Sequence, residues 1–199
     1  MDDTTDSPPN REDYDDIREF IRDWEYYWDN QKPSALALVR RAASVANDAA
    51  VAIDMQLERI REGYRRGDPD ALRTVQIDTE FLISSLWKMR LAGKLARSVM
   101  GQAWTALSEY DRALPHLKLM RDVMEHIDEY GGDADGRARR HDHPRSGQHI
   151  GRRYLHSQMS HSDESFNWLG GTVEFGPARV ASLQLLSAIR TARDGFVGT

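Results

Sequence analysis

The sequence predicts an all-α protein, an up-and-down bundle of four or five helices with a small β-hairpin before the last helix. Apolar residues recur at alternating steps of three and four from residue 36 to residue 99, which is the period of a buried helical stripe. Glycine and proline stand where such stripes stop and start. The segment Phe166–Phe175 instead has two short β-favouring runs around Gly170-Gly171, which is typical of a hairpin.

The two central helices form the most regular part of the pattern. We expect them at residues 36–65 and 70–99, separated by Gly67-Asp68-Pro69 as a glycine stop, an Asp N-cap and a proline at the first helical position. So short a connection predicts an antiparallel hairpin. The two seams consist of Leu36, Val39, Ala43, Ala46, Ala50, Ile53, Leu57, Ile60 and Tyr64, and of Leu72, Val75, Thr79, Leu82, Leu86, Met89, Gly93 and Ala96.

The remaining elements are shorter. Residues 1–13 are acidic and nearly free of apolar residues, which predicts a disordered tail, and residues 14–199 are expected to form one domain. A final helix should open at Gly176-Pro177. Two further helices are predicted from apolar residues that share a face, namely Ile17, Phe20, Ile21, Trp24 and Trp28 in the first and Trp104, Leu107 and Tyr110 in the second.

Composition limits the possible chemistry. The 199 residues include no cysteine, which excludes disulfides, thiolate metal sites and cysteine nucleophiles and fits a reducing cytoplasm. The sequence has no apolar run of membrane-spanning length, so no membrane partner is expected. A net charge of −5 argues against indiscriminate nucleic-acid binding, and the usual phosphate and dinucleotide motifs that hold cofactors are missing.

The central stretch Pro115–Tyr130 predicts one further helix, opened by Pro115 and closed by Gly131-Gly132. Arg121 and His126 flank its charged strip, because five residues on an ideal helix correspond to about 140° of rotation. The pattern Arg121-Asp122-x-x-x-His126 resembles the R-x4-6-H motif of the HEPN superfamily, which comprises helical bundles of toxin–antitoxin pairs, phage defence and RNA processing. The likeness extends more loosely over residues 78–130 and 166–193.

The resemblance implies a metal-independent endoribonuclease whose site is shared across a homodimer, with an antitoxin or regulatory protein as a further partner. His126 would take the 2′-OH proton, Arg121 would hold the phosphate, and Asp122 would orient the imidazole. Two alternatives stay open: a non-catalytic module of this fold that binds a nucleotide, RNA or a protein, and a structural or regulatory helical dimer. In the plainest interpretation, Arg121 simply pairs with Glu125 one turn later.

Residues 132–165 form a long basic segment without an apolar period. Its arginines could follow an RNA backbone while Tyr154 stacks on a base. Its histidines, among them His141, His143, His149, His156 and His161, match no closed metal site, and we expect no metal. The predicted RNA-binding residues are Arg137, Arg139, Arg140, Arg145, Arg152, Arg153 and Tyr154.

Overall fold

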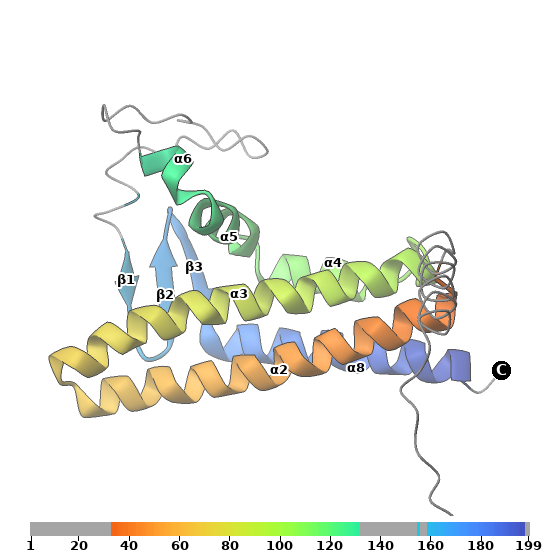
Figure 1. Ribbon diagram of the computed structural model, residues 1–199, viewed down its shortest axis with the longest axis horizontal. Coiled ribbons are helices and arrows are strands. Elements are labelled where there is room, and N and C mark those ends of the chain that lie inside the picture. Colours follow the sequence, from red (N-terminus) through yellow and green to blue (C-terminus); the bar gives the residue numbers. More distant parts are fainter. Residues whose placement is uncertain (1–32, 132–154, 156–158, 198–199) are drawn as a thin grey trace, which may run out of the picture. The chain divides into compact units, whose positions relative to one another are not determined.

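The computed structural model describes residues 33–131, 155 and 159–197 of the chain. The chain divides into two units, Met1–Ser34 and Ala35–Thr199, and all helices and strands given below belong to the second unit. This unit is mostly helical and holds a small antiparallel sheet before its last helix (Figure 1). The predicted acidic tail and the predicted helix with Trp24 and Trp28 lie outside the described residues.

The predicted hairpin is confirmed. Helix α2 spans Ala35–Arg66 and helix α3 spans Pro69–Met100, so that only two residues connect them. Gly67 takes a φ of 65°, which a side chain would disfavour, and Asp68 caps α3 by accepting a 2.8 Å hydrogen bond from the Ala71 backbone N–H. Helix α3 ends at Gly101, whose N–H donates back to the carbonyl of Arg97.

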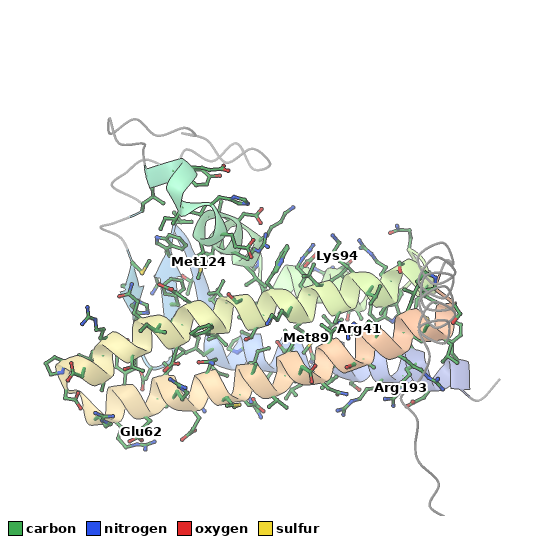
Figure 2. All side chains as sticks on the ribbon, viewed as in Figure 1. Arg41, Glu62, Met89, Lys94, Met124 and Arg193 are labelled. Carbon is green, nitrogen blue, oxygen red and sulfur yellow. The ribbon has the colours of Figure 1, made fainter. Side chains whose placement is uncertain are left out.

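Small side chains let the two helices approach each other closely. The buried face of α2 is rich in alanine, and Gly63 lies so near α3 that an added Cβ would stand 2.4 Å from Val75 Cγ2. Larger residues of α3, such as Leu86 and Met89, are fully buried in the core. Figure 2 labels Met89 on this helix. Leu72 was expected in the seam but is 44% exposed, because the neighbouring Ala71, which is 3% exposed, packs near Gly63 of α2 in this turn instead.

Helix α8, Phe175–Val197, completes the long helical layer by packing along both α2 and α3. Arg179 donates to Asp54 at 2.6 Å, and Arg190 donates to Asn47 at 2.6 Å. Because the two α8 residues rise in number while their α2 partners fall, α8 runs antiparallel to α2 (Figure 1). Among the described residues, no helix combines the length and apolar character that crossing a membrane would require.

The sheet has three strands rather than the predicted two. Strand β1 is Ser160–His161, β2 is Ser165–Trp168 and β3 is Gly171–Glu174, in the order β1-β2-β3 and antiparallel throughout. The prediction confined strands to Phe166–Phe175 and was wrong about β1, because two residues carry too little periodicity to be recognised. The pairs His161–Phe166 and Phe166–Val173 place these side chains side by side on one face of the sheet.

The turn between β2 and β3 is built from Leu169-Gly170, not from Gly170-Gly171. Leu169 has a φ of 53° and Gly170 a φ of 74°, as a tight two-residue hairpin needs. Burial of the Leu169 side chain offsets the strain of this conformation. Gly171 serves another purpose, since an added Cβ would stand 2.3 Å from the ring of His116. The absence of a side chain at Gly171 therefore lets the sheet approach His116, which is the N-cap residue of the helix that begins at Leu117.

Helix α4 spans Ala106–Ala113. The predicted single helix Pro115–Tyr130, which follows it, is in fact two helices. Helix α5 spans Leu117–Glu125 and α6 spans Ile127–Gly131, and they are separated by a break at His126, where φ is −120° and ψ is 31°. The break leaves Ile127 46% exposed and buries Tyr130 to 2% exposure. An uninterrupted helix would have placed both residues on its apolar arc, so the break exposes Ile127 while Tyr130 stays buried.

Candidate functional site

Arg121 projects from the middle of α5 and is held by groups of its own protomer. Its Nη1 donates to Asp122 Oδ1 at 3.1 Å, and its Nη2 forms an ion pair with Glu125 one turn later. The side chain is 24% exposed, and its Nε is buried without a hydrogen-bond partner. The guanidinium is thus reachable from solvent, although two carboxylates already neutralise it.

The guanidinium of Arg121 lies over the indole ring of Trp87 from α3. The guanidinium carbon of Arg121 lies 5.1 Å from the centroid of the indole ring, and that of Arg90 lies 5.0 Å from it. Arg90 in turn makes a two-pronged pair with Asp111 of α4, at 2.6 and 2.8 Å. Such cation–π contacts are worth about 0.5–2 kcal/mol. They join α3, α4 and α5 into one surface, which α-helical periodicity alone does not reveal.

His126 lies at the break between α5 and α6 and is 49% exposed. Its Nδ1 lies 3.5 Å from Glu129 Oε1, which is an ion-pair distance but longer than a good hydrogen bond. Asp122, which the sequence predicted to orient this imidazole, accepts a hydrogen bond from Arg121. A carboxylate beside Nδ1 favours the tautomer that leaves a lone pair on Nε2, as a general base requires.

The arrangement can do two kinds of chemistry. His126 exposes an imidazole that can accept or donate a proton, and Arg121 offers a charged fork to an anion. An anion at Arg121 would have to displace Glu125, whose ion pair with it is a partly exposed i,i+4 contact worth about 0.3–0.5 kcal/mol. Displacement is therefore easy, but nearby carboxylates mean that one protomer alone presents little net positive charge.

The predicted RNA-binding residues, from Arg137 to Tyr154, lie outside the described residues, as do four of the five loop histidines named above. His161 is described, and it lies half-buried in the sheet with its ring 5.0 Å from that of Phe166. Burial lowers the pKa of His161 below its ordinary value, because desolvation penalises the charged imidazolium. In the described part of the chain, no three His, Cys, Asp or Glu side chains gather as a metal site.

A cavity of about 160 Å³ lies where α3, the α5–α6 break and the sheet meet. Met124, labelled in Figure 2, is the residue before Glu125. It lines this cavity together with Ile127, which follows His126. The sequence predicted Phe166 and Trp168 only as strand residues, not as part of a cavity. The alternation of Phe166 and Trp168, two residues apart, was the available signal that both share one face.

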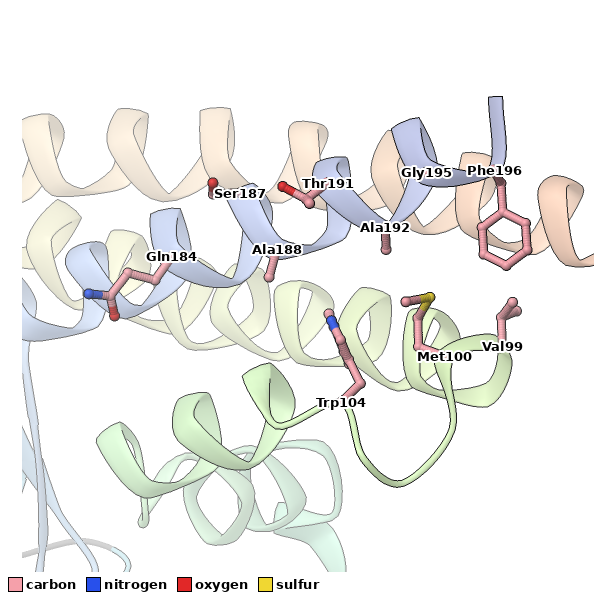
Figure 3. A pocket seen from close by; sticks show the side chains of 10 residues that line it. All are labelled: Val99, Met100, Trp104, Gln184, Ser187, Ala188, Thr191, Ala192, Gly195 and Phe196. Carbon is pink, nitrogen blue, oxygen red and sulfur yellow. The ribbon is translucent and has the colours of Figure 1, made fainter. Parts of the chain in front are cut away.

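A second and larger concavity of about 900 Å³ lies between the C-terminal halves of α3 and α8 (Figure 3). Trp104, Met100 and Phe196 give it a mainly apolar lining, and none of the described residues that line it is ionisable. Its composition therefore offers shape and apolar contact but no proton transfer or anion binding.

Comparison with protein-family models, with curated proteins and with solved structures found no match for this chain.

Proposed function

We propose that this chain is a HEPN-like, RNA-acting protein with a bundle fold, which functions as a metal-independent endoribonuclease through a site shared by two copies. The observation that carries the proposal is the pairing of a half-exposed His126 with the Glu129 carboxylate, one turn beyond an accessible Arg121. RNA supplies its own nucleophile, so a base and an anion-binding fork suffice for cleavage.

The reaction would begin when His126 Nε2 takes the proton of a ribose 2′-OH. The resulting oxygen attacks the adjacent phosphorus while Arg121 stabilises the charge on the phosphoryl oxygens. The bond from phosphorus to the 5′-oxygen breaks, and the leaving oxygen receives a proton from the imidazolium of the second copy. The products are a 2′,3′-cyclic phosphate and a 5′-OH end. Two copies are needed because the step uses two imidazoles, one that takes the 2′-OH proton and one that protonates the leaving oxygen.

A second function is favoured by one specific observation. Arg121 contacts Asp122, Glu125 and Trp87 within its own protomer, as a structural arginine does. If these contacts persist, the chain would be a non-catalytic module that binds RNA, a nucleotide or a partner protein. The two functions make different predictions for a variant that lacks the imidazole.

The test measures cleavage of several RNA classes in EDTA, together with end-group analysis. We expect 2′,3′-cyclic phosphate ends and inert DNA, and His126→Ala should lower the rate about 10²–10⁴-fold because the general base is lost. Arg121→Lys should also be poor, since an ammonium lacks the two-pronged contact. Arg40→Lys, an exposed arginine of α2, is the matched control and should match the parent protein.

Three results would decide against the proposal. Cleavage that survives His126→Ala would place the activity elsewhere. RNA binding without cleavage, weakening with salt by a log–log slope of about −0.7 per neutralised phosphate, would support the non-catalytic module. If the chain neither cleaves nor binds RNA, or if light scattering shows a monomer, the site shared by two copies would be excluded.

A further inference from the structure

The small cavity beside His126 has walls suited to a flat ring. Met124, Ile127 and Met159 line it together with Phe166 and Trp168, so apolar side chains with thioether and aromatic groups make up much of its walls. Its volume of about 160 Å³ is far below the 300–1,000 Å³ typical of drug-sized sites. It is close to the roughly 150 Å³ of an engineered cavity that admits benzene. One ring fits, whereas a whole nucleotide does not.

Two ring nitrogens at this cavity have no hydrogen-bond partner. Trp168 is 1% exposed, and its Nε1 is buried and unpaired. His161 Nδ1 is likewise buried and unpaired. Leaving a buried donor or acceptor unsatisfied costs about 1–3 kcal/mol, and buried indole N–H groups usually find an acceptor. Both side chains line the same cavity, so a single ligand with polar edge atoms could satisfy both.

The rim adds a polar edge on the α3 side. Gln76 and Glu80 line the cavity and are exposed to solvent, so their polar ends can meet a ligand without prior desolvation. A carboxylate accepts hydrogen bonds from ring or exocyclic N–H groups, and an amide can both donate and accept. The cavity therefore offers apolar faces, a buried N–H donor and an acceptor at the opening.

We propose that this cavity binds a nucleobase, either of a free nucleoside or of one nucleotide of an RNA strand. A ring carbonyl or ring nitrogen would accept the Trp168 N–H, Phe166 and Met124 would contact the ring, and Glu80 would accept from a ring or amino N–H of the base. Each of the four RNA bases carries both an acceptor and such an N–H on its edge. The RNA form rests on the proposed function; the nucleoside form does not.

The position of His126 gives the RNA form a mechanistic meaning. His126 lies in the chain between two lining residues, Met124 and Ile127. A base held in the cavity would tether its ribose close to the α5–α6 break, where the imidazole is exposed. The cavity would then select the nucleotide at which cleavage occurs, because unpaired RNA bases can be splayed out and stacked on aromatic side chains.

The experiment follows the indole N–H signals of the full chain by nuclear magnetic resonance while ribonucleosides are added. The chain has five tryptophans, and Trp→Phe changes at the other four identify the Trp168 signal without altering the cavity. Adenosine, guanosine, cytidine and uridine should each shift the Trp168 signal at millimolar concentration. The signals of Trp87 and Trp104 should stay in place.

Two matched variants separate the cavity from the surface. Ile127→Phe adds bulk at the lining and should weaken nucleoside binding about tenfold or more. Ile77→Phe makes the same change at a position of similar exposure, 49% against 46%, outside the lining, and should leave binding unchanged. Glu80→Gln should weaken nucleoside binding without removing it, because the neutral amide oxygen is a weaker acceptor than the carboxylate.

Three results would overturn the base site. The first is a Trp168 signal that does not shift with any nucleoside or with a short single-stranded RNA. The second is an equal weakening of nucleoside binding by Ile127→Phe and Ile77→Phe. The third is binding of benzene, which lacks a hydrogen-bond acceptor, as tightly as the nucleosides. A shift with nucleosides but no RNA cleavage would keep the base site and remove the endoribonuclease. His126-dependent cleavage without any Trp168 shift would do the reverse.

Discussion

The α2–α3 hairpin and the α5–α6 segment use helices in opposite ways. The hairpin consists of two 32-residue helices joined by two residues and packed along an unbroken seam. The α5–α6 segment consists of nine and five residues and breaks at a half-exposed histidine. The first arrangement resists change because each turn supports the next. The second leaves backbone and side chains free to serve a site.

Buried polar atoms without a partner occur in both regions. In the hairpin, the Nε of Arg59 lies 2.9 Å from Asp78 Oδ1, but Asp78 Oδ2 and Gln56 Oε1 stay unpaired. At the α5–α6 break and the neighbouring sheet, the Nε of Arg121 and the Nε1 of Trp168 stay unpaired. The difference is that Trp168 lines a cavity, where a ligand can contribute the missing contact.

The largest expected difference between the two regions is in hydrogen exchange. Amides of α3 around Ile83–Met89 should exchange only through global unfolding, which typically requires about 5–15 kcal/mol. Amides of α6 should exchange through local opening at about 0–2 kcal/mol. Helix α4 is also short and therefore controls for the effect of helix length on exchange. It is anchored to α3, because Asp111 accepts from Arg90 and the hydroxyl of the buried Tyr110 donates to the Leu86 carbonyl. Equal protection of α6 and α3 would contradict the comparison.

A core truncation in the hairpin should have the next largest effect. Leu86→Ala removes a side chain with 0% exposure from the centre of α3 and should lower the free energy of unfolding by about 2–5 kcal/mol. Leu91→Ala on the same helix is the control, since Leu91 is 42% exposed and its loss should stay within about 0.5 kcal/mol. Urea unfolding of both variants measures the difference. Similar losses would mean that the seam is not where the stability lies.

The smallest expected effect is at the turn and depends on pH. The Ala71 backbone N–H, followed by the Arg66 side chain, lowers the pKa of Asp68 below its ordinary value. A carboxylate with a lowered folded-state pKa stabilises the protein above its unfolded pKa of about 3.9 and loses that contribution as pH falls through the folded value. Asp68→Ala should therefore lower the urea midpoint at pH 7 and make no difference near pH 2. A loss that is the same at both pH values would show that the carboxylate charge plays no part.

The sequence predicted the hairpin well because its information is local and repeated. Many seam residues, a glycine stop, a capping aspartate and a first-turn proline all indicate the same two helices, and few alternatives satisfy them. The α5–α6 break was missed because it depends on long-range contacts. Whether Ile127 or Tyr130 is buried is decided by the sheet and α3, which the spacing within residues 115–130 cannot show.

The candidate site was predictable only in part. The motif located Arg121 and His126 on one short segment, and the structure places both at accessible positions. Trp87, Glu129 and the cavity residues from the sheet were not predicted, since their roles depend on tertiary packing between distant segments. The predicted homodimer and the predicted RNA contacts remain predictions for the experiments above.

The junction of β3 and α8 has a consequence for how the length of this protein can vary. Strand β3 ends at Glu174 and α8 begins at Phe175, with no residue between them. Inserting or deleting a single residue there would rotate the whole of α8 by about 100° relative to the sheet. Arg179 and Arg190, which now reach α2 at the edge of the core, would turn away from Asp54 and Asn47. We therefore expect length variation to be tolerated at surface turns but not at this junction.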